Sequence, residues 1–463
     1  MHKFIAKYAV AAHLAFTAVA PLFLLPFFTV SQIAVVELWL AFAGAVWVMM
    51  APSCRMGESL PMARRRLFGS LVKDPLFWTT LLFVIFALVQ LLNTGIARAY
   101  DPELNRWSIS PAPCDFLPGS AKSESAFLMF SAALAMLVLV IGLGHGLGKN
   151  ARLAFAVSSS SLAAVGGIVA ILMMYGGDER ILKLIAVDYS SPLFPGVAYG
   201  IWLLVAVSAL FGVIEAGWMS MELLVAVALI GNAAGLYIFA PALDILVFAG
   251  AVLVLVIFSF IVQHHELRGA ASLRSIIMIL AASVLPILAS ISADGGSVLD
   301  LKTRALLDFK PFDDGFFALR DCLNALAQKI WREAPLLGGG LDSFPIRMRF
   351  LATDADWALV RPWQTAVPCG WWQLLCERGV VGAAALALPV AASVWNFGFR
   401  AFLSRAFFPW RALHIVGLLA LAAVTAVSFF DASLLRPEAF MALISALVLG
   451  AAGVPRKRDD SAE

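Results

Sequence analysis

The chain has 463 residues, of which 62% are hydrophobic and 14% charged, and its formal net charge is +3. A soluble domain normally has about 45–50% apolar and about 25% charged residues, so a water-soluble fold of this composition would expose too much apolar surface. The small positive charge gives no support to a nucleic-acid partner. The composition therefore predicts a polytopic membrane protein.

Apolar runs recur along the whole chain, and a bilayer core needs about 20 apolar residues per helix. Runs of about this length lie near residues 8–30, 33–52, 75–96, 125–147, 152–174, 195–214, 222–240, 242–263, 275–293, 372–396, 412–430 and 437–454. They predict an all-α, polytopic membrane helical bundle with about 12 transmembrane helices and a large periplasmic loop that contains amphipathic helices. Pro241 leaves open whether its two flanking runs are separate spans or one kinked element.

Lysine and arginine residues in the short loops predict the orientation of the bundle. If the N-terminus is cytoplasmic, almost every short basic loop and the basic tail fall on the same side as it. Both termini are then cytoplasmic, and residues 97–124, 175–194 and 294–371 lie outside. This organisation divides the chain into a bundle of about nine spans (1–293), a large periplasmic loop (294–371) and three spans with a short cytoplasmic tail (372–463).

The helix centres contain few ionisable residues. His13 and Asn232 are the main polar exceptions, while Glu37 and Asp244 lie at the outer boundary, where we expect water to reach them. Transporters usually place charges and broken helices at mid-depth. A transporter or flippase is therefore disfavoured, and we expect a substrate site at the outer face.

Five cysteines show no metal-type spacing such as C-x-x-C, so the sequence predicts neither a metal site nor a cofactor. Three of them, Cys114, Cys322 and Cys369, fall in the predicted external segments. Two of these three could pair in an oxidising space, and the sequence does not say which.

The first patterned stretch of the large external segment is FFALRDCLNALAQKIWRE (316–333). Its apolar residues follow helical spacing. Arg320, Asn324 and Gln328 form one polar stripe, so the pattern predicts an amphipathic helix resting on the membrane surface. PLLGGGLDSF (335–344) follows. Its glycines allow the backbone to come close to a ligand or to another helix, and no Lys-Ser/Thr pair supports a phosphate loop of the Walker type.

Arginines gather around the return to the membrane. Arg347, Arg349 and Arg361 follow the glycine turn, and WWQLLCERGVVG (371–382) places Gln373, Glu377 and Arg378 at the mouth of the next helix. We expect Arg436 and Glu438 in DASLLRPEAF (431–440) to face the same aqueous layer. Guanidinium groups bind phosphate oxygens in a bidentate manner, so this cluster suits a phosphate or diphosphate headgroup. It could equally anchor anionic lipid, and the arginines alone do not choose.

Three stretches resemble the O-antigen ligase and O-antigen polymerase superfamily of membrane glycosyltransferases. They are ALRDCLNALAQKIWREAPLLGGGLDSF (318–344), QLLCERGVVG (373–382) and SFFDASLLRPEAFMALISALVLG (428–450), with a fainter match in DYSSPLFPGVAYGIWLL (188–204). The first resembles that family's loop motif, the second the start of its next helix, and the third its last external turn and final span. Arg320 matches the loop arginine of that family.

The resemblance implies a metal-independent glycosyltransferase without a cofactor, in a bacterial inner (cytoplasmic) membrane. The donor would be an undecaprenyl-diphosphate-linked glycan, and the acceptor the lipid A-core or a growing glycan, within membrane lipids. Arg320 and Glu377 are then the candidate catalytic residues. The candidate diphosphate- and glycan-binding residues are Arg347, Arg349, Arg361, Arg378 and Arg436. Ligase and polymerase share topology and donor, so the sequence does not separate them.

The chain departs from that family at one place. A His-Asn dipeptide is typical before the helix that matches 373–382, and here Val367-Pro368-Cys369-Gly370-Trp371 stands instead. All six histidines lie inside the membrane or on the cytoplasmic side of the predicted topology. Three alternatives remain: a carboxylate serves as the base, base catalysis is minor, or the protein is a catalytically inactive glycan-lipid-binding or assembly partner. The candidate carboxylates are Glu377, Asp342, Asp354 and Asp356.

Overall fold

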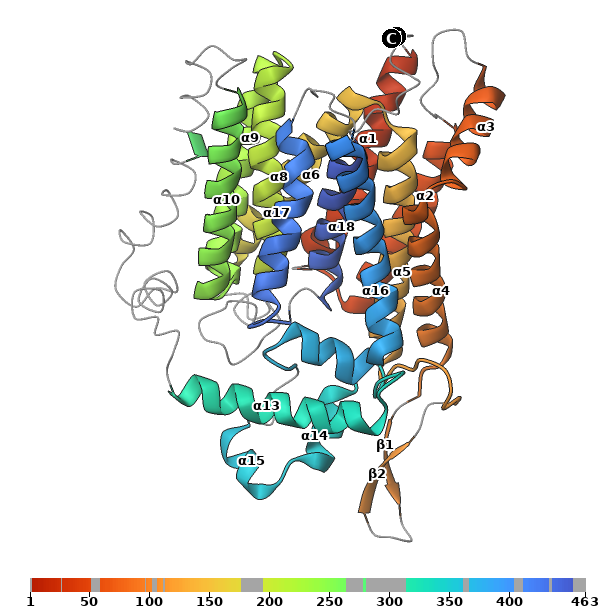
Figure 1. The fold of residues 1–463 in the computed structure, drawn as a ribbon, viewed down its shortest axis with the longest axis vertical. Helices are drawn as coiled ribbons and strands as arrows, with labels where there is room; N and C mark the ends of the chain where they lie inside the picture. The colour runs from red at the N-terminus through yellow and green to blue at the C-terminus, as the bar shows by residue number, and fades with distance from the viewer. Residues whose placement is uncertain are drawn as a thin grey trace.

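The computed structural model describes residues 2–25, 27–50, 59–95, 97–101, 106–110, 113–175, 195–263, 278–279, 314–360, 366–403, 411–432 and 435–452. Within these ranges the regular structure is helical apart from one antiparallel β-hairpin. Figure 1 shows long helices side by side in a bundle, with α13 lying across one end of it.

The long apolar helices follow the predicted runs. They are α1 (His2–Leu24), α2 (Val30–Met50), α4 (Pro75–Leu92), α5 (Ser123–Ile141), α6 (Lys149–Tyr175), α8 (Gly196–Glu215), α9 (Met219–Phe239), α10 (Ala242–Gln263), α16 (Gly370–Leu403), α17 (Arg411–Val427) and α18 (Pro437–Ala452). Helices α9 and α10 are separate elements, so the alternative at Pro241 is resolved in favour of two helices.

Among the described residues, 7 helices are long and apolar enough to cross a membrane. They are α2, α4, α5 with its π-helical extension η1 (Gly142–Gly146), α6, α8, α9 and α16. The apolar parts of α1, α10, α17 and α18 are shorter. The predicted run 275–293 lies outside the described residues except at 278–279, so the count of about 12 spans stays a prediction.

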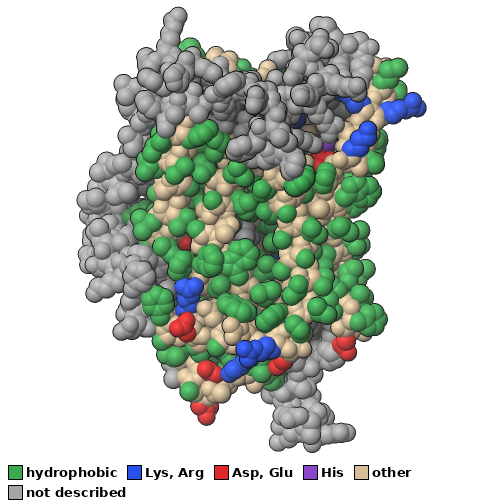
Figure 2. Space-filling model, in the orientation of Figure 1, with side chains coloured by type: hydrophobic (Ala, Val, Ile, Leu, Met, Phe, Trp, Pro, Cys, Tyr) green, Lys and Arg blue, Asp and Glu red, His purple; other side chains and the backbone are tan. Residues whose placement is uncertain are grey.

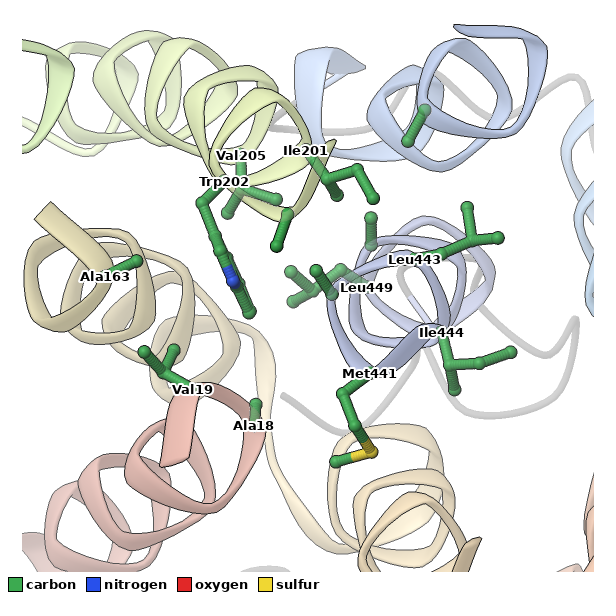
Figure 3. Packing of buried hydrophobic residues seen from close by; sticks show 14 of the residues in the cluster. Ala18, Val19, Ala163, Ile201, Trp202, Val205, Met441, Leu443, Ile444 and Leu449 are labelled. Carbon is green, nitrogen blue, oxygen red and sulfur yellow. The ribbon is translucent and has the colours of Figure 1, made fainter. Parts of the chain in front are cut away.

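Helix α8 forms the centre of the bundle, because 94% of the residues in its most apolar stretch are buried inside the protein. Figure 3 shows Trp202 of α8 between side chains of α1, α6 and α18, and the labelled residues come from all four helices: Ala18, Val19, Ala163, Ile201, Val205, Met441, Leu443, Ile444 and Leu449. Small residues let these helices come close, which is how helices pack when the surrounding solvent is itself apolar.

The outer surface of the bundle is apolar as well. Trp39 and Phe42 of α2 are 64% and 63% exposed. On the face in Figure 2, hydrophobic side chains cover the middle of the bundle, and most charged side chains lie towards its two ends. An exposed apolar belt between charged ends is typical of a protein that lies in a bilayer.

Two ends of the bundle can be told apart (Figure 1). Helix α3 (Leu60–Leu71), which carries Arg64, Arg65 and Arg66, lies at the end where α1 begins and α18 ends. Helices α13 (Asp314–Glu333), α14 (Phe344–Leu351) and α15 (Asp354–Leu359) lie at the other end. The structure thus places the predicted external helix opposite the basic segment, while the assignment of cytoplasm and periplasm stays a prediction.

Helix α13 confirms the amphipathic helix predicted for 316–333. Its apolar stripe does not face outwards, however, because Leu323, Leu326 and Ile330 pack against Phe344 and Met348 of α14 in a second hydrophobic core. This core also includes Cys376 of α16. The stripe therefore packs against protein, and the position of this helix on the membrane surface stays a prediction.

Two features differ from the sequence-based expectations. Residues 97–110 contain a β-hairpin, β1 (Ala97–Asp101) paired with β2 (Arg106–Ser110), which the all-α prediction did not include. Glu37 and Asp244 have 0% exposed surface, so the expectation that water reaches them is wrong in this structure. Glu37 lies two turns inside α2, whereas Asp244 lies in the first turn of α10, and both side chains are buried in the bundle.

Candidate functional site

A cavity of about 260 Å³ lies at the α13 end of the bundle, between α1, α2, α5, α16 and the start of α18. Its apolar wall comes from α1 and α2, and includes Pro21, Leu25 and Ile33. The opposite wall is polar, and its members are Asp342, Gln373, Glu377, Arg378, Arg436 and Glu438. Three residues predicted from sequence, Glu377, Arg378 and Arg436, thus meet in one cavity although 58 positions separate Arg378 from Arg436.

The glycine turn shapes this wall because it packs against a break in α16. Gly379 has φ 61° and ψ −169°, which interrupts the helix directly after Arg378. The carbonyls of Cys376 and Glu377 accept hydrogen bonds from the Gly339 and Gly340 N–H groups at 2.7 and 2.9 Å. In return, Val380 N–H donates to the Pro335 carbonyl at 3.0 Å. The turn supplies the partners that the broken helix has lost.

Glycine is required at this contact. A Cβ on Gly379 would lie 2.3 Å from the Leu336 carbonyl oxygen, and one on Gly338 would lie 2.4 Å from the Glu377 carbonyl carbon. Both residues also have positive φ angles, which residues with a side chain adopt rarely. Of the two alternatives for the glycines, close approach to another helix is therefore what the structure contains, and this contact orients Glu377 and Arg378.

Arg378 is the most unusual residue of the cavity. It is 1% exposed, and its Nη1 has no hydrogen-bond partner in the part of the chain that the structure describes. Its side chain runs over Gly382, where a Cβ would lie 2.4 Å from the Cβ of Arg378. A buried guanidinium N–H group without an acceptor is costly even beside carboxylates, because a polar group out of water needs a hydrogen bond. Such a group fits a ligand that brings negative charge.

Two carboxylates lie beside Arg378. Asp342 accepts a hydrogen bond from the Ser125 hydroxyl of α5 and has φ 58°, a left-handed conformation that is uncommon outside glycine. Glu377 is 4% exposed, and its Oε1 lies 3.4 Å from the Phe344 N–H, a long hydrogen bond. Strained backbone positions are frequent at functional sites. Both carboxylates thus lie on the cavity wall with contacts to the protein.

Arg436 enters the cavity from the segment before α18. Its Nε donates to Oε1 of Glu438, which lies in the first turn of α18. A carboxylate near a helix N-terminus is stabilised by the helix dipole, so Glu438 is well placed to hold an arginine. The Arg436 side chain is 19% exposed, compared with 4% for that of Glu438.

Arg320 lies apart from the cavity wall. Its Nη2 donates to the Phe429 carbonyl at 2.5 Å, and its guanidinium carbon lies 4.7 Å from the centre of the Phe430 ring. These contacts join α13 to the turn between α17 and α18. The structure gives Arg320 a fixed position, and its predicted catalytic role stays a prediction.

Arg347 and Arg349 also lie outside this cavity. Arg347 pairs with Glu333 at 3.1 Å and lines a second cavity of about 330 Å³ on the outer side of the glycine turn. Arg349 is exposed on α14. Arg361 lies outside the described residues. Sequence proximity thus overstated this group, because the helical turns of α14 point its arginines away from Arg378.

Two of the proposed bases lie away from the cavity, on α15. Asp356 caps the N-terminus of α15 together with Thr353, and hydrogen bonds from the Thr353 backbone and hydroxyl lower the pKa of Asp356. Asp354 is exposed in the same turn. Neither lines the cavity, so Glu377 and Asp342 are the members of the proposed set that do.

The described cysteines Cys114, Cys322, Cys369 and Cys376 are free thiols, so the pairing that the sequence left open does not occur among them. Burial and the neighbouring Asp356 raise the pKa of the Cys322 thiol to about 11, which makes it a poor nucleophile. Groups of three or more His, Cys, Asp or Glu side chains arranged to hold a metal ion do not occur within the described ranges.

Glu37 and Glu438 were not among the site residues predicted from sequence, although Glu438 was expected to face the same aqueous layer as Arg436. Glu438 lines the cavity directly, and Glu37 lies one helical turn beyond Ile33 on the same face of α2. Two signals could have found them: a carboxylate two residues after a predicted site arginine, and a glutamate within an otherwise apolar run. No protein-family model and no curated protein matches this chain.

Proposed function

We propose that the chain is a glycosyltransferase-type membrane protein that acts on undecaprenyl-diphosphate-linked glycan at the α13 end of the bundle. In this proposal that end is periplasmic, both termini are cytoplasmic, and the membrane is a bacterial inner membrane. The observation that carries the proposal is Arg378, a buried guanidinium without a partner for its Nη1, on the wall of a cavity that also contains Arg436 and three carboxylates.

The two arginines suit the diphosphate of such a donor. Guanidinium groups bind phosphate oxygens through paired N–H groups, and they stabilise the charge that grows on a leaving diphosphate. The apolar wall from α1 and α2 suits the first isoprene units of the lipid, because Leu25, Val30 and Ile33 line it. One cavity therefore offers complementary surfaces to both parts of the donor at the boundary where they join.

The transfer step needs a base for the acceptor. The acceptor hydroxyl oxygen attacks the anomeric carbon, the bond from that carbon to the diphosphate oxygen breaks, and the electron pair leaves with the lipid diphosphate. Glu377 accepts the hydroxyl proton, since its carboxylate lies on the cavity wall beside Arg378. This assignment gives a carboxylate the role that a loop histidine has in the superfamily that the chain resembles. The acceptor is a lipid A-core or a growing glycan.

Release of undecaprenyl diphosphate from lipid-linked glycan tests the proposal in proteoliposomes that contain the full chain and an acceptor glycan. Arg378→Gln should lower the release rate by about a hundredfold or more, because it removes a charge next to the leaving group. Arg332→Gln is the matched control, since Arg332 is exposed in the last turn of α13. Equal rates for the wild type and Arg378→Gln would refute the proposal.

A second candidate function is a glycan-lipid-binding or assembly partner that does not turn the donor over. The observation that favours it is the lack of a histidine on the cavity wall among the described residues, since His13 bonds to the Leu40 carbonyl and His145 lies at the α3 end. Under this alternative, the wild type binds the lipid-linked glycan through Arg378 yet releases no lipid diphosphate at any pH.

A further inference from the structure

Gln373 is a polar side chain of the cavity wall that the proposed transfer does not use. It is 5% exposed, and it lies near the start of α16, one helical turn before Glu377 on the same face. Helix α16 begins at the α13 end of the bundle (Figure 1). Gln373 therefore lies nearer to that end than Glu377 and Arg378 do.

A hydrogen bond fixes the orientation of the Gln373 carboxamide. The Val367 N–H donates to Oε1 of Gln373 at 2.7 Å. A backbone N–H can only donate, so its partner is the carboxamide oxygen, and the other terminal atom of the side chain is Nε2. Val367 is itself 0% exposed and belongs to the second hydrophobic core. The oxygen of Gln373 is thus held by a backbone group that is fixed in the core.

The nitrogen of the carboxamide faces the cavity. Nε2 makes no hydrogen bond within the described residues, and it is not one of the fully buried polar atoms that lack a partner. Because the Gln373 side chain lines the cavity, the accessible surface of Nε2 lies on the cavity side. Two N–H groups that donate and cannot accept therefore stand one helical turn from the Glu377 carboxylate.

The position of this donor indicates which part of the ligand it meets. In the proposed function the lipid tail lies along α1 and α2, and the arginines hold the diphosphate, so the sugar extends towards the α13 end. A group that only donates is best matched by an oxygen that only accepts. A sugar hydroxyl both donates and accepts, whereas the carbonyl oxygen of an acetamido group accepts only.

We propose that Gln373 donates through Nε2 to the acetamido carbonyl oxygen of the first sugar of the donor, and so selects a 2-acetamido sugar over a 2-hydroxy sugar. A sugar with only a hydroxyl group at C2 does not reach Nε2 and leaves its N–H groups without an acceptor. A site that is arranged to form a hydrogen bond discriminates against a ligand that lacks the partner. This inference rests on the proposed function, because it uses the same cavity.

Two ligands that differ only at C2 test the inference: farnesyl diphosphate linked to N-acetylglucosamine and farnesyl diphosphate linked to glucose. Calorimetry with the full chain in nanodiscs should show that the wild type prefers the first by about tenfold, the value of one hydrogen bond. Gln373→Glu keeps an oxygen for the Val367 N–H and replaces Nε2 by a second oxygen. Gln373→Met removes both atoms. We expect the preference to disappear in both variants.

Gln32→Glu is the matched control. Its Oε1 also accepts a backbone N–H, that of Thr29 at 3.0 Å, but the Gln32 side chain is exposed. This variant should keep the preference. A wild type that binds both ligands equally, or a preference that survives in either Gln373 variant, overturns this inference and leaves the proposed function intact. A wild type that binds neither ligand overturns both.

Discussion

Each end of the bundle contains a buried cluster of ionisable side chains, and the two clusters differ in whether their polar atoms have partners. At the α3 end, Asp74 accepts hydrogen bonds from the Asn396 amide at 2.9 Å and the Leu76 N–H at 3.0 Å. Its other oxygen lies 2.6 Å from Nε2 of His145, and Nδ1 of that ring lies 3.0 Å from Ser70 Oγ. This cluster joins α3, α4, η1 and α16, and its hydrogen bonds are complete.

The cluster at the α13 end is incomplete. Arg378 is as buried as Asp74, yet its Nη1 has no partner, and both oxygens of Glu37 are equally unpaired. Buried polar groups in proteins are normally hydrogen-bonded, and exceptions often mark places where a ligand supplies the missing partner. We therefore infer that the first cluster stabilises the fold and that the second binds a ligand. The residue types alone would not distinguish the two clusters.

The largest expected effect is on binding by Arg378→Met. This substitution should weaken the affinity for a diphosphodiester by a hundredfold or more, about 3 kcal/mol, because a charge-assisted phosphate contact is lost. The thermal unfolding temperature should change little, because the apolar side chain relieves the cost of the unpartnered Nη1 while Glu377 and Asp342 lose a neighbouring positive charge. Calorimetric binding and thermal unfolding in the same detergent check both parts. A large loss of stability would assign Arg378 to the architecture instead.

Asp74→Ala should show the opposite pattern. Removing the carboxylate leaves three hydrogen-bond donors without their acceptor and removes the N-cap of α4, which costs about 3 kcal/mol of unfolding free energy. The affinity for the diphosphodiester should not change. Thermal unfolding of this variant beside Asp321→Ala, an exposed position on α13, checks the expectation. A weakened affinity in a folded Asp74→Ala protein would contradict the inference that only the cluster at the α13 end binds the ligand.

The pH dependence of stability offers a smaller effect at the same cluster. Burial acts to raise the pKa of Asp74, but hydrogen bonds from His145 and Asn396 prevail and hold it at about 2, below the ordinary 3.8. A lowered folded-state pKa stabilises the protein above the unfolded pKa, and this contribution, roughly 2 kcal/mol, is lost as the pH falls from about 4 to 2. The stability difference between wild type and Asp74→Asn should shrink across that window. A constant difference would contradict the assigned pKa.

Arg320→Ala should have the smallest effect of the four. It removes a hydrogen bond to a carbonyl and a cation–π contact, together worth about 1 to 2 kcal/mol of stability. Transfer should fall by less than about tenfold, through a looser α13 rather than a lost charge at the leaving group. Rate measurements beside Arg378→Gln rank the two arginines. If Arg320→Ala abolishes transfer while the protein stays folded, Arg320 has the catalytic role predicted from sequence. The smaller role that its position outside the cavity indicates is then wrong.

Local periodicity predicted the helices well, because it records which face of each helix is apolar. The amphipathic helix expected at 316–333 is α13, Asp314–Glu333, and the separate runs on either side of Pro241 are α9 and α10. The β-hairpin at 97–110 was missed because its strands have only 5 residues each, too few for alternation to stand out.

The site was less predictable, because its members depend on how distant segments pack. Glu377, Arg378 and Arg436 line one cavity, whereas Arg347 lines another, and the functional roles of all of them stay predictions. The break at Gly379 decides this difference, since it turns Arg378 inwards, and a glycine within a helical pattern does not reveal such a turn. The burial of Glu37 likewise depends on its surroundings in the bundle, which the composition of α2 alone does not encode.

The central claim is that Arg378 and Arg436 hold the diphosphate of a lipid-linked glycan. The most direct measurement is an electron cryomicroscopy structure of the full chain in nanodiscs with farnesyl-diphospho-N-acetylglucosamine. The account predicts phosphate density within hydrogen-bonding distance of the Arg378 guanidinium, with Arg436 turned from Glu438 towards it and the farnesyl chain along α1 and α2. Phosphate density at Arg320 or Arg347, with the Arg378 cavity unchanged, would contradict it.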